Sequence, residues 1–401
     1  MIARKNLRKY LIFPTLILAL AIPSQGFAAP KLISVKALTK WSDAVGIELI
    51  TSTSKSVVTV KNISALTADI EVQARDFSGT LLWSKTIDSG FDEVATAIAP
   101  DGQGNVWLAG NSAAPISADT STVGVAGLNP DGVVIETPAQ LRPDMRLLTL
   151  WKVNQMGEVQ EKFTLSQSDI SLIDAVAVSA TGVSLLASRE SGPSIISANI
   201  KGLFGKEIKI GTTKTKLSAI IRSSDGTISV FGSSTETLAG KKLVGREDGV
   251  LIKISKAGSI ASVIRSSTPK SYRNWNSATS SLFLTGSVKS GAVTESAITK
   301  FTNTFVPTWT TRISSTGYAL ASNGPSGSFY VVLEPTAAIK GLSNFKAVKG
   351  QSLVIQFDSK GAISNAFSGT ELKAAKAITY SPDGGLFILT EDSIFKVGAS
   401  K

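Results

Sequence analysis

The side chains that could do chemistry in this chain are limited by two absences, because its 401 residues include no histidine and no cysteine. A Ser-His-Asp triad, a thiolate nucleophile and a zinc site with His or Cys ligands are therefore excluded. The groups that remain for proton transfer or nucleophilic attack are carboxylates, lysine, tyrosine and a serine paired with lysine. Any enzyme built from this sequence would have to use one of these groups.

Paired carboxylates fit this limit, since two Asp or Glu side chains roughly 5 to 10 Å apart can hydrolyse a glycosidic bond. Five candidates lie near the ends of expected strands: Asp92, Glu93, Asp174, Glu247 and Asp248. No acidic pair recurs at corresponding positions of the repeated units described below. An extracytoplasmic, carboxylate-dependent polysaccharide hydrolase or lyase is therefore the alternative function, behind a non-catalytic binding protein. A quinone-dependent dehydrogenase lacks a cofactor signature.

The candidate binding residues are Tyr272, Arg273 and Trp275, which follow one another with Asn274 between them. The pattern places this group in a connection between two repeated units. Two aromatic rings with a guanidinium could stack on a sugar or a peptide, and the same residue types also serve packing. We therefore name Tyr272, Arg273 and Trp275 as the candidate ligand-binding residues, and packing remains the other interpretation.

Several Asp-Gly pairs, among them 101–102, 225–226, 248–249 and 383–384, raise the question of calcium loops. A hairpin turn needs only the positive φ that Asp and Gly tolerate. No Asp-x-Asp-x-Asp spacing accompanies the pairs, as a calcium loop would require. We therefore predict hairpin turns, no metal site and no cofactor.

The elements that must position these residues are short strands. From Gly46 onward apolar residues alternate with polar ones over short segments that Gly, Asn, Pro and Asp-Gly interrupt. This period of two predicts an all-β protein. One unit is clear: 217–232 gives two strands, a polar loop follows, and 248–263 gives two more. Four strands in two hairpins are typical of one propeller blade.

Repetition of this unit predicts a seven-bladed β-propeller over residues 31–401 as a single domain. The spacing is about 53 residues per blade, near the 40 to 50 known for propeller repeats. The last unit supplies only three strands, between Ala375 and Val397, and Leu32–Leu38 is left over at the other end. Pairing the two ends would close the ring and cover the exposed strand edges. We therefore expect N- and C-terminal strands in one blade.

The turn and strand pattern also resembles a known group of repeats. Ser224-Asp225-Gly226, Phe231-Gly232, Asp248-Gly249 and Gly258 carry the pattern, which Asp101-Gly102, Ala109-Gly110 and Asp383-Gly384 echo. It is similar to the bacterial secreted propeller repeats called SBBP or delta-60-like repeats, which are WD40-like. The resemblance implies a propeller fold, and it implies no activity.

The first residues look like a targeting signal. Arg4, Lys5, Arg8 and Lys9 precede an apolar run of about 13 residues, and small residues Gly26 and Ala28 mark a cleavage site. A membrane-spanning helix needs about 20 apolar residues, so we predict a cleaved signal peptide over 1–28, with no membrane span afterwards. Cleavage leaves 37 basic against 30 acidic residues, and we expect a secreted or extracytoplasmic monomer.

The longest insertions indicate where a partner would bind. Four segments are expected between the second and third strands of their blades: 111–146, 233–247, 287–296 and 334–351. Such loops share one rim, and long loops on a rigid scaffold commonly bind partners. They carry 9 basic and 8 acidic residues, which disfavours nucleic acid because phosphates require clustered cations. The predicted function is a non-catalytic scaffold that binds a protein or a cell-surface polysaccharide through this rim.

Overall fold

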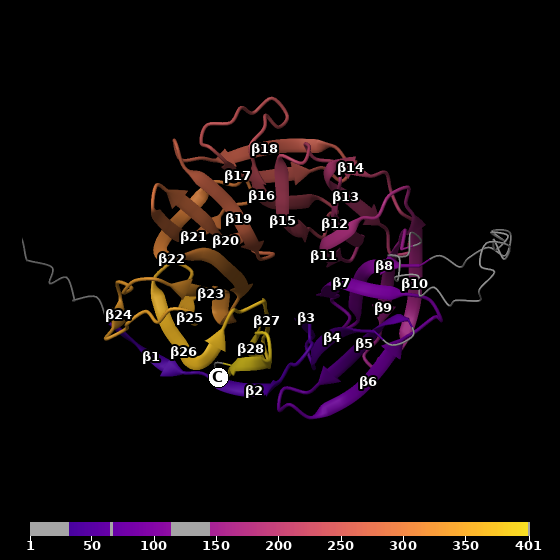
Figure 1. Cartoon of the computed structure of the whole chain (residues 1–401), viewed down its shortest axis with the longest axis horizontal. Helices are drawn as coiled ribbons and strands as arrows, with labels where there is room; N and C mark the ends of the chain where they lie inside the picture. Colours follow the sequence, from indigo (N-terminus) through magenta and orange to yellow (C-terminus); the bar gives the residue numbers. More distant parts are fainter. Residues whose placement is uncertain (1–31, 65–66, 114–144, 400–401) are drawn as a thin grey trace, which may run out of the picture. The chain divides into compact units, whose positions relative to one another are not determined.

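Antiparallel strands make up nearly all of the regular structure, which we describe from a computed structural model covering residues 32–64, 67–113 and 145–399. Within these ranges the helical content is one short 3-10 helix, η1 (Pro325–Gly327). The strand sheets stand around a common centre, as Figure 1 shows. The all-β propeller prediction is therefore correct in its class. The signal-peptide prediction for 1–28 lies outside the described residues, and the domain boundaries stay a prediction.

Five sheets are separate four-stranded blades, in which the first strand lies nearest the centre and the fourth lies outside (Figure 1). Their strands, from the centre outwards, are β3 (Leu49–Ser52), β4 (Val57–Ser64), β5 (Ala68–Arg75) and β6 (Leu81–Ile87); β7 (Glu93–Pro100), β8 (Val106–Ser112), β9 (Leu147–Val153) and β10 (Val159–Ser166); β11 (Leu172–Ser179), β12 (Gly182–Arg189), β13 (Gly192–Ala198) and β14 (Ile208–Lys209); β15 (Thr215–Arg222), β16 (Ile228–Ser234), β17 (Asp248–Ile254) and β18 (Ile260–Ser266); β27 (Ala377–Ser381), β28 (Gly385–Leu389), β29 (Ser393–Val397) and β2 (Thr39–Asp43).

The remaining strands form one nine-stranded sheet. In hydrogen-bonded order they are β19 (Tyr272–Ala278), β20 (Phe283–Ser290), β21 (Val293–Phe301), β22 (Pro307–Asn323), β23 (Phe329–Pro335), β25 (Gln351–Phe357), β26 (Ile363–Lys373), β1 (Ile33–Ala37) and β24 (Leu342–Ser343).

The prediction of seven blades is wrong, because the structure contains five separate blades. The cause is β22, which runs without interruption through 17 residues. Its first part pairs with β21 and its second part pairs with β23, so the strands on both sides belong to a single sheet. The sequence pattern had divided β22 into two strands in different blades.

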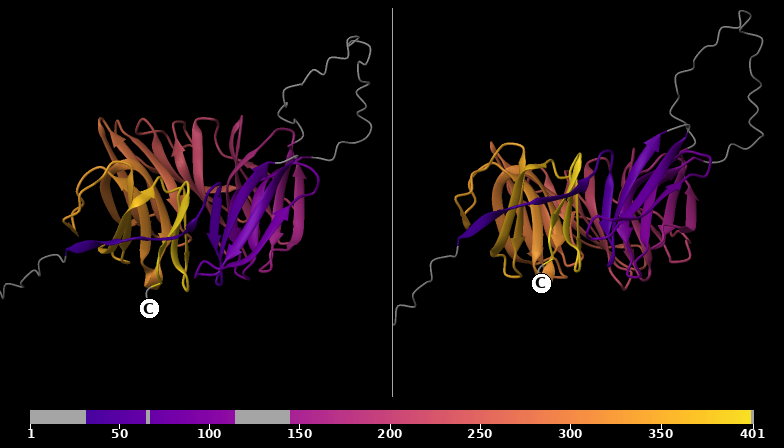
Figure 2. Two further views of the ribbon diagram at one scale, coloured as in Figure 1. Left: turned by 60° about the horizontal axis from the view of Figure 1, so that its bottom comes forward. Right: turned by 90° about the horizontal axis from the view of Figure 1, so that it is seen from below.

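Ring closure also uses a different strand from the one predicted. The C-terminal strand β29 pairs with β2, and the register places Thr39 opposite Lys396. The segment Leu32–Leu38 instead contains β1, which adds in parallel to β26 and to β24. Figure 2 shows β1 and β2 in indigo along the outside of the C-terminal strands. A strand near each end of the described chain takes part in the closure, but Leu32–Leu38 is not the closing strand.

A five-residue turn recurs at the hairpins and accounts for the Asp-Gly pair at 101–102, whereas Asp248 and Gly249 lie in β17, so the turn predicted there is wrong. In the turn between β9 and β10, the Asn154 side-chain oxygen accepts hydrogen bonds from the amides of Met156 and Glu158, both at 2.9 Å. Gly157 takes the positive φ, +83°. The same arrangement of Asp or Asn first and Gly fourth begins at residues 76, 101, 199 and 358. At Asp101 the left-handed residue is thus Gly104, not the Gly102 of the Asp-Gly pair.

Outer-strand tryptophans connect one set of strands to the next through these turns. Trp41 on β2, Trp83 on β6 and Trp309 on β22 each donate the indole N–H to the carbonyl of the second turn residue that follows around the ring. The distances are 3.2, 2.7 and 3.1 Å. A Cβ at the glycine of the same turn would lie 2.6 Å from the Trp83 ring at Gly157 and 2.7 Å from the Trp309 ring at Gly361, but 3.7 Å from Trp41 at Gly79, which is an ordinary contact. These contacts hold neighbouring blades in register.

The hydrophobic core lies between the faces of neighbouring blades. Leu150 of β9 and Leu185 of β12 are buried in one such layer, and Leu186 of β12 packs with Val250 of β17 in the next. Since each blade is buried on both faces, its middle strands are apolar at almost every position. This explains why their alternation in the sequence is weak.

Candidate functional site

The predicted binding residues form the start of an inner strand. Tyr272, Arg273 and Trp275 belong to β19, so their assignment to a connection between units is wrong. Side chains alternate along a strand, and Arg273 and Trp275 are buried while Tyr272 is 41% exposed. The structure therefore brings Arg273 and Trp275 together and places Tyr272 on the other face.

Arg273 is a buried cation without a counter-ion. It is 8% exposed, and its guanidinium has no hydrogen bond or ion pair with any residue that the structure describes. Its one close partner is the Trp275 ring, whose centroid lies 4.6 Å from Cζ. Burial lowers the pKa of Arg273 to about 10, with a smaller contribution from the positive charge of Arg312. A buried charge in this state is costly unless something pairs with it.

A glycine on the neighbouring blade makes room for this pair. Gly249 of β17 faces Trp275 so closely that a Cβ there would lie 2.8 Å from the indole nitrogen and 3.4 Å from the Arg273 Cγ. The indole N–H of Trp275 is itself buried without an acceptor. Two donors, one charged and one neutral, thus lie side by side with no acceptor among the described residues. The sequence could not indicate Gly249, because its role depends on a contact between sheets.

Two exposed cations, Arg246 and Lys289, lie beside Tyr272. Arg246, in the loop between β16 and β17, places its Cζ 5.7 Å from the Tyr272 ring centroid and its Nη1 3.4 Å from the hydroxyl. Lys289 stands directly opposite Tyr272 on β20. Both Arg246 and Lys289 are exposed. Arg273 and Trp275 on one face of β19, and Tyr272 with Arg246 and Lys289 on the other, are together called the Arg273 site below. Its positive charges favour an anionic group.

A second buried arginine shows the contrasting arrangement. Arg265 on β18 forms an ion pair with Asp248, 3.2 Å from Nη1 to the carboxylate, and both side chains are almost fully buried. Arg265 also donates to the carbonyl oxygens of Lys241 and Glu236. Asp248 accepts from the amides of Val244 and Gly245 at 2.9 Å. This network holds the β16–β17 loop, so Asp248 is structural.

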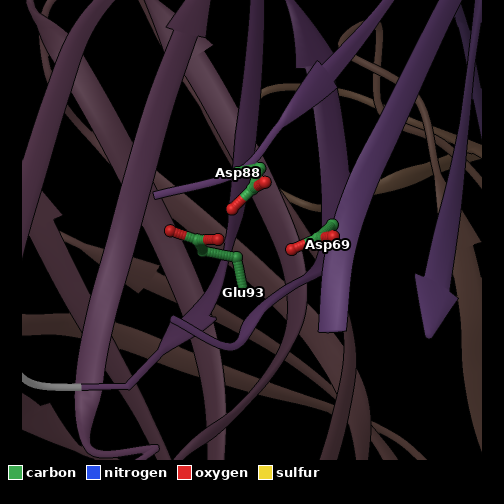
Figure 3. Close-up of side chains that lie close together, drawn as sticks. All are labelled: Asp69, Asp88 and Glu93. Atoms are coloured by element: carbon green, nitrogen blue, oxygen red, sulfur yellow. The ribbon is translucent and has the colours of Figure 1, made fainter. Parts of the chain in front are cut away.

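Three carboxylates lie together at another place. The carboxylate oxygens of Asp69, Asp88 and Glu93 are within 4.8 Å of one another, and Figure 3 shows them pointing toward a common centre. Oxygen ligands of this kind suit Ca²⁺. Lys162 already supplies a positive charge, with its ammonium 3.3 Å from Glu93. Asp69 and Glu93 are buried and only Asp88 is exposed, so a substrate could not reach two carboxyl groups of the cluster.

Asp174, on an inner strand, has a carboxyl pKa above its ordinary value. It lies on β11 and accepts a hydrogen bond of 2.5 Å from the Ser188 hydroxyl. Burial raises the pKa of the Asp174 carboxyl above its usual value, although the residue keeps contact with solvent. Glu93 and Asp248 are occupied by ion pairs, so the acids named from the sequence do not form an accessible catalytic pair with Asp174.

We expect Asp174→Asn to stabilise the protein at neutral pH and to leave stability unchanged at pH 3. A folded-state pKa above the unfolded value means that the native state binds more protons in the interval between them. Stability therefore falls as pH rises through that interval, and the full penalty is present above both values. Asn removes the charge and keeps an oxygen for Ser188. Urea denaturation of both proteins between pH 3 and 8 measures the difference; equal curves at pH 7 would contradict the assignment.

The expected loop rim is only partly present. The segments 233–247 and 334–351 do connect second and third strands, and the latter includes β24. In contrast, 287–296 is a tight hairpin, with two residues between β20 and β21. Residues 114–144 of the fourth segment lie outside the described residues. Within the described ranges no helix is long and apolar enough to cross a membrane.

Comparisons with known proteins support the fold and little else. No family model and no curated protein sequence matches the chain. A structure described as streptogramin B lyase is similar to it at 12% identity, with a TM-score of 0.50, over 90% of this chain and 96% of that one. The Dos1 propeller shares 10% identity, with a TM-score of 0.48, over 91% and 83%. The likeness shows a β-propeller, and the SBBP repeat family gains no support.

Proposed function

We propose that this chain is a secreted, non-catalytic β-propeller that binds a protein or a cell-surface polysaccharide through an anionic group. The observation that carries the proposal is Arg273, whose guanidinium makes no hydrogen bond or ion pair with any described residue and whose Nε is buried without an acceptor. A ligand carboxylate or phosphate would supply the missing acceptor. Charge-assisted hydrogen bonds of this kind are about twice as strong as neutral ones.

The surroundings of Arg273 support an anionic ligand over a cationic or apolar one. Arg312, from the same sheet, adds positive charge next to Arg273, and Arg246 and Lys289 lie beside Tyr272 on the opposite face of β19. The Tyr272 ring offers an exposed flat face beside these cations, as a sugar or peptide plane requires. Secretion remains part of the proposal, on the basis of residues 1–28.

The alternative function, a carboxylate-dependent hydrolase or lyase, has less support. Its best candidate is the cluster of Asp69, Asp88 and Glu93. Two accessible carboxyl groups are needed for acid and nucleophile or base. Two of the three are buried, and Lys162 neutralises Glu93, so we propose a structural role for this cluster.

Arg273→Met is expected to reduce affinity for an anionic ligand by about a hundredfold, since it removes the donor and keeps the volume. The probes are polygalacturonate, a phosphate-bearing teichoic acid and a poly-glutamate peptide, measured by calorimetry at low and high salt, with neutral dextran as a control polymer. Arg75→Met is the matched variant, because among the described residues the Arg75 guanidinium donates a single hydrogen bond, to the turn carbonyl of Gly79. If no anionic probe binds, or if both variants bind equally, the proposal fails. Turnover of the polysaccharides would revive the hydrolase.

A further inference from the structure

Exposed cations gather where the blade β15–β18 meets strand β19, its neighbour around the ring (Figure 1). Three segments meet there: the loop between β16 and β17, the connection between β18 and β19, and the end of β20. They carry five exposed cations, namely Lys241, Lys242, Arg246, Lys270 and Lys289. These five residues are called the basic strip below.

Backbone contacts hold the three segments against one another. The amide of Arg246 donates to the Ser271 carbonyl at 2.9 Å, so the β16–β17 loop and the β18–β19 connection lie side by side. Arg265 of β18 donates from Nε to the Lys241 carbonyl at 3.1 Å and fixes the middle of the same loop. Lys289 lies opposite the first residue of β19. The basic strip is therefore one continuous part of the surface.

The charges of the basic strip are not neutralised by its own segments. None of the five cations forms an ion pair with a described residue. Asp248, the buried acid of β17, is occupied by its ion pair, and Glu236 accepts hydrogen bonds of 2.6 to 3.0 Å from Thr212 and Thr215. Five cations against Glu236 and Glu247 leave an excess of three positive charges. Such an excess attracts a polyanion.

The make-up of the basic strip favours a charged polymer over a single anionic group. Each exposed ion pair contributes little by itself, so a ligand gains affinity by reaching several cations at once. Four of the five cations are lysines, which act as flexible point charges and tolerate variable spacing. Tyr272, 41% exposed, adds one flat ring beside them, which suits a sugar plane. Single-stranded nucleic acid is instead bound by several rings that stack on successive bases.

We propose that the basic strip binds a linear acidic polysaccharide, whose carboxylates repeat along the chain and contact several of the five cations at once. This inference rests on the proposed function for the anionic class of ligand, and it names the form of that ligand as a polymer. It adds Lys241, Lys242 and Lys270 to the binding surface. These three lysines are outside the Arg273 site, so they can be changed while that site stays intact.

The test measures calorimetric binding of polygalacturonate to the full protein and to a triple variant with Lys241→Gln, Lys242→Gln and Lys270→Gln. The triple variant should bind about tenfold more weakly at low salt, because three exposed ion pairs are lost. Its affinity should also depend less on salt, since fewer counterions are released. The matched control changes three exposed lysines in turns at the other ends of their strands: Lys201→Gln, Lys256→Gln and Lys360→Gln. The control should bind as the unchanged protein does.

Three outcomes overturn the proposal: no binding of polygalacturonate, equal affinity of the two triple variants, or tighter binding of DNA of equal charge than of polygalacturonate. Thermal unfolding of both triple variants checks that they fold. Arg273→Met, with all five cations of the basic strip in place, separates this inference from the proposed function. If Arg273→Met binds normally and the first triple variant binds weakly, the role of Arg273 fails and the basic strip stands. The reverse result removes the basic strip alone.

Discussion

Arg265→Met is expected to lower the free energy of unfolding by about 3–5 kcal/mol, because it leaves Asp248 as a buried carboxylate without its cation. Both side chains are nearly inaccessible, and their distance of 3.2 Å is that of a direct ion pair. The substitution also removes the donor to the Lys241 and Glu236 carbonyls, so the β16–β17 loop loses its anchor. Urea denaturation at pH 7 measures the loss.

Arg273→Met is the matched experiment and should have the opposite sign. Methionine fills a similar volume, and the charge that it removes has no carboxylate partner in the described chain. The fall of the Arg273 pKa to about 10 corresponds to a penalty on the order of 3 kcal/mol for the charged form. Loss of the cation–π contact with Trp275 offsets part of the gain. We expect a net stabilisation of about 1–2 kcal/mol.

The contrast between the two arginines separates a structural ion pair from a binding group. A residue that weakens the free protein and strengthens its complex is what a binding site requires. If Arg273→Met destabilised the protein as much as Arg265→Met, Arg273 would have an unrecognised structural partner. The functional proposal would then lose its main support.

The sequence predicted individual strands well and their assembly less well. The two strands expected in 217–232 correspond to β15 and β16, and those expected in Ala375–Val397 correspond to β27, β28 and β29. These strands follow from local alternation and turn residues. The number of blades depended on whether Ile313 and Tyr318 belong to one strand, and local patterns cannot show that β22 continues through Gly317.

The closing strand was chosen wrongly for a related reason. Leu32–Leu38 and Thr39–Asp43 are adjacent, and either can be read as a strand. What distinguishes β2 is Trp41, which packs edge-on against Phe387 at 5.0 Å and donates to the Phe77 carbonyl. Both partners are distant in the sequence. The alternation of apolar and polar residues along the sequence cannot show which of the two segments closes the ring, because that choice depends on these distant contacts.

The candidate site was found by residue type but not in its arrangement. Tyr272, Arg273 and Trp275 were identified as a group, yet a strand assignment was needed to see that Arg273 and Trp275 share a face. The lack of an acceptor for Arg273, and the space that Gly249 leaves, are properties of two packed sheets. No local signal could have indicated them.

Gly157→Ala is expected to cost about 3–4 kcal/mol in the free energy of unfolding, since it combines backbone strain with a clash. Gly157 has φ +83°, and a Cβ there would lie 2.6 Å from the Trp83 ring and 2.8 Å from Lys85. The ring cannot withdraw easily because its N–H is bonded to the Gln155 carbonyl at 2.7 Å. The contact between two blades would therefore have to open.

Gly350→Ala isolates the backbone contribution. Gly350 has φ +78°, and a Cβ there would meet nothing within 4 Å, so its cost should be about 1 kcal/mol. The difference between the two variants measures the contact with Trp83. In a double variant, Trp83→Ala should remove most of the extra cost of Gly157→Ala, because neighbouring sites are not additive. Equal losses in the two glycine variants, measured by urea denaturation, would show that the outer-strand tryptophans do not hold the blades together.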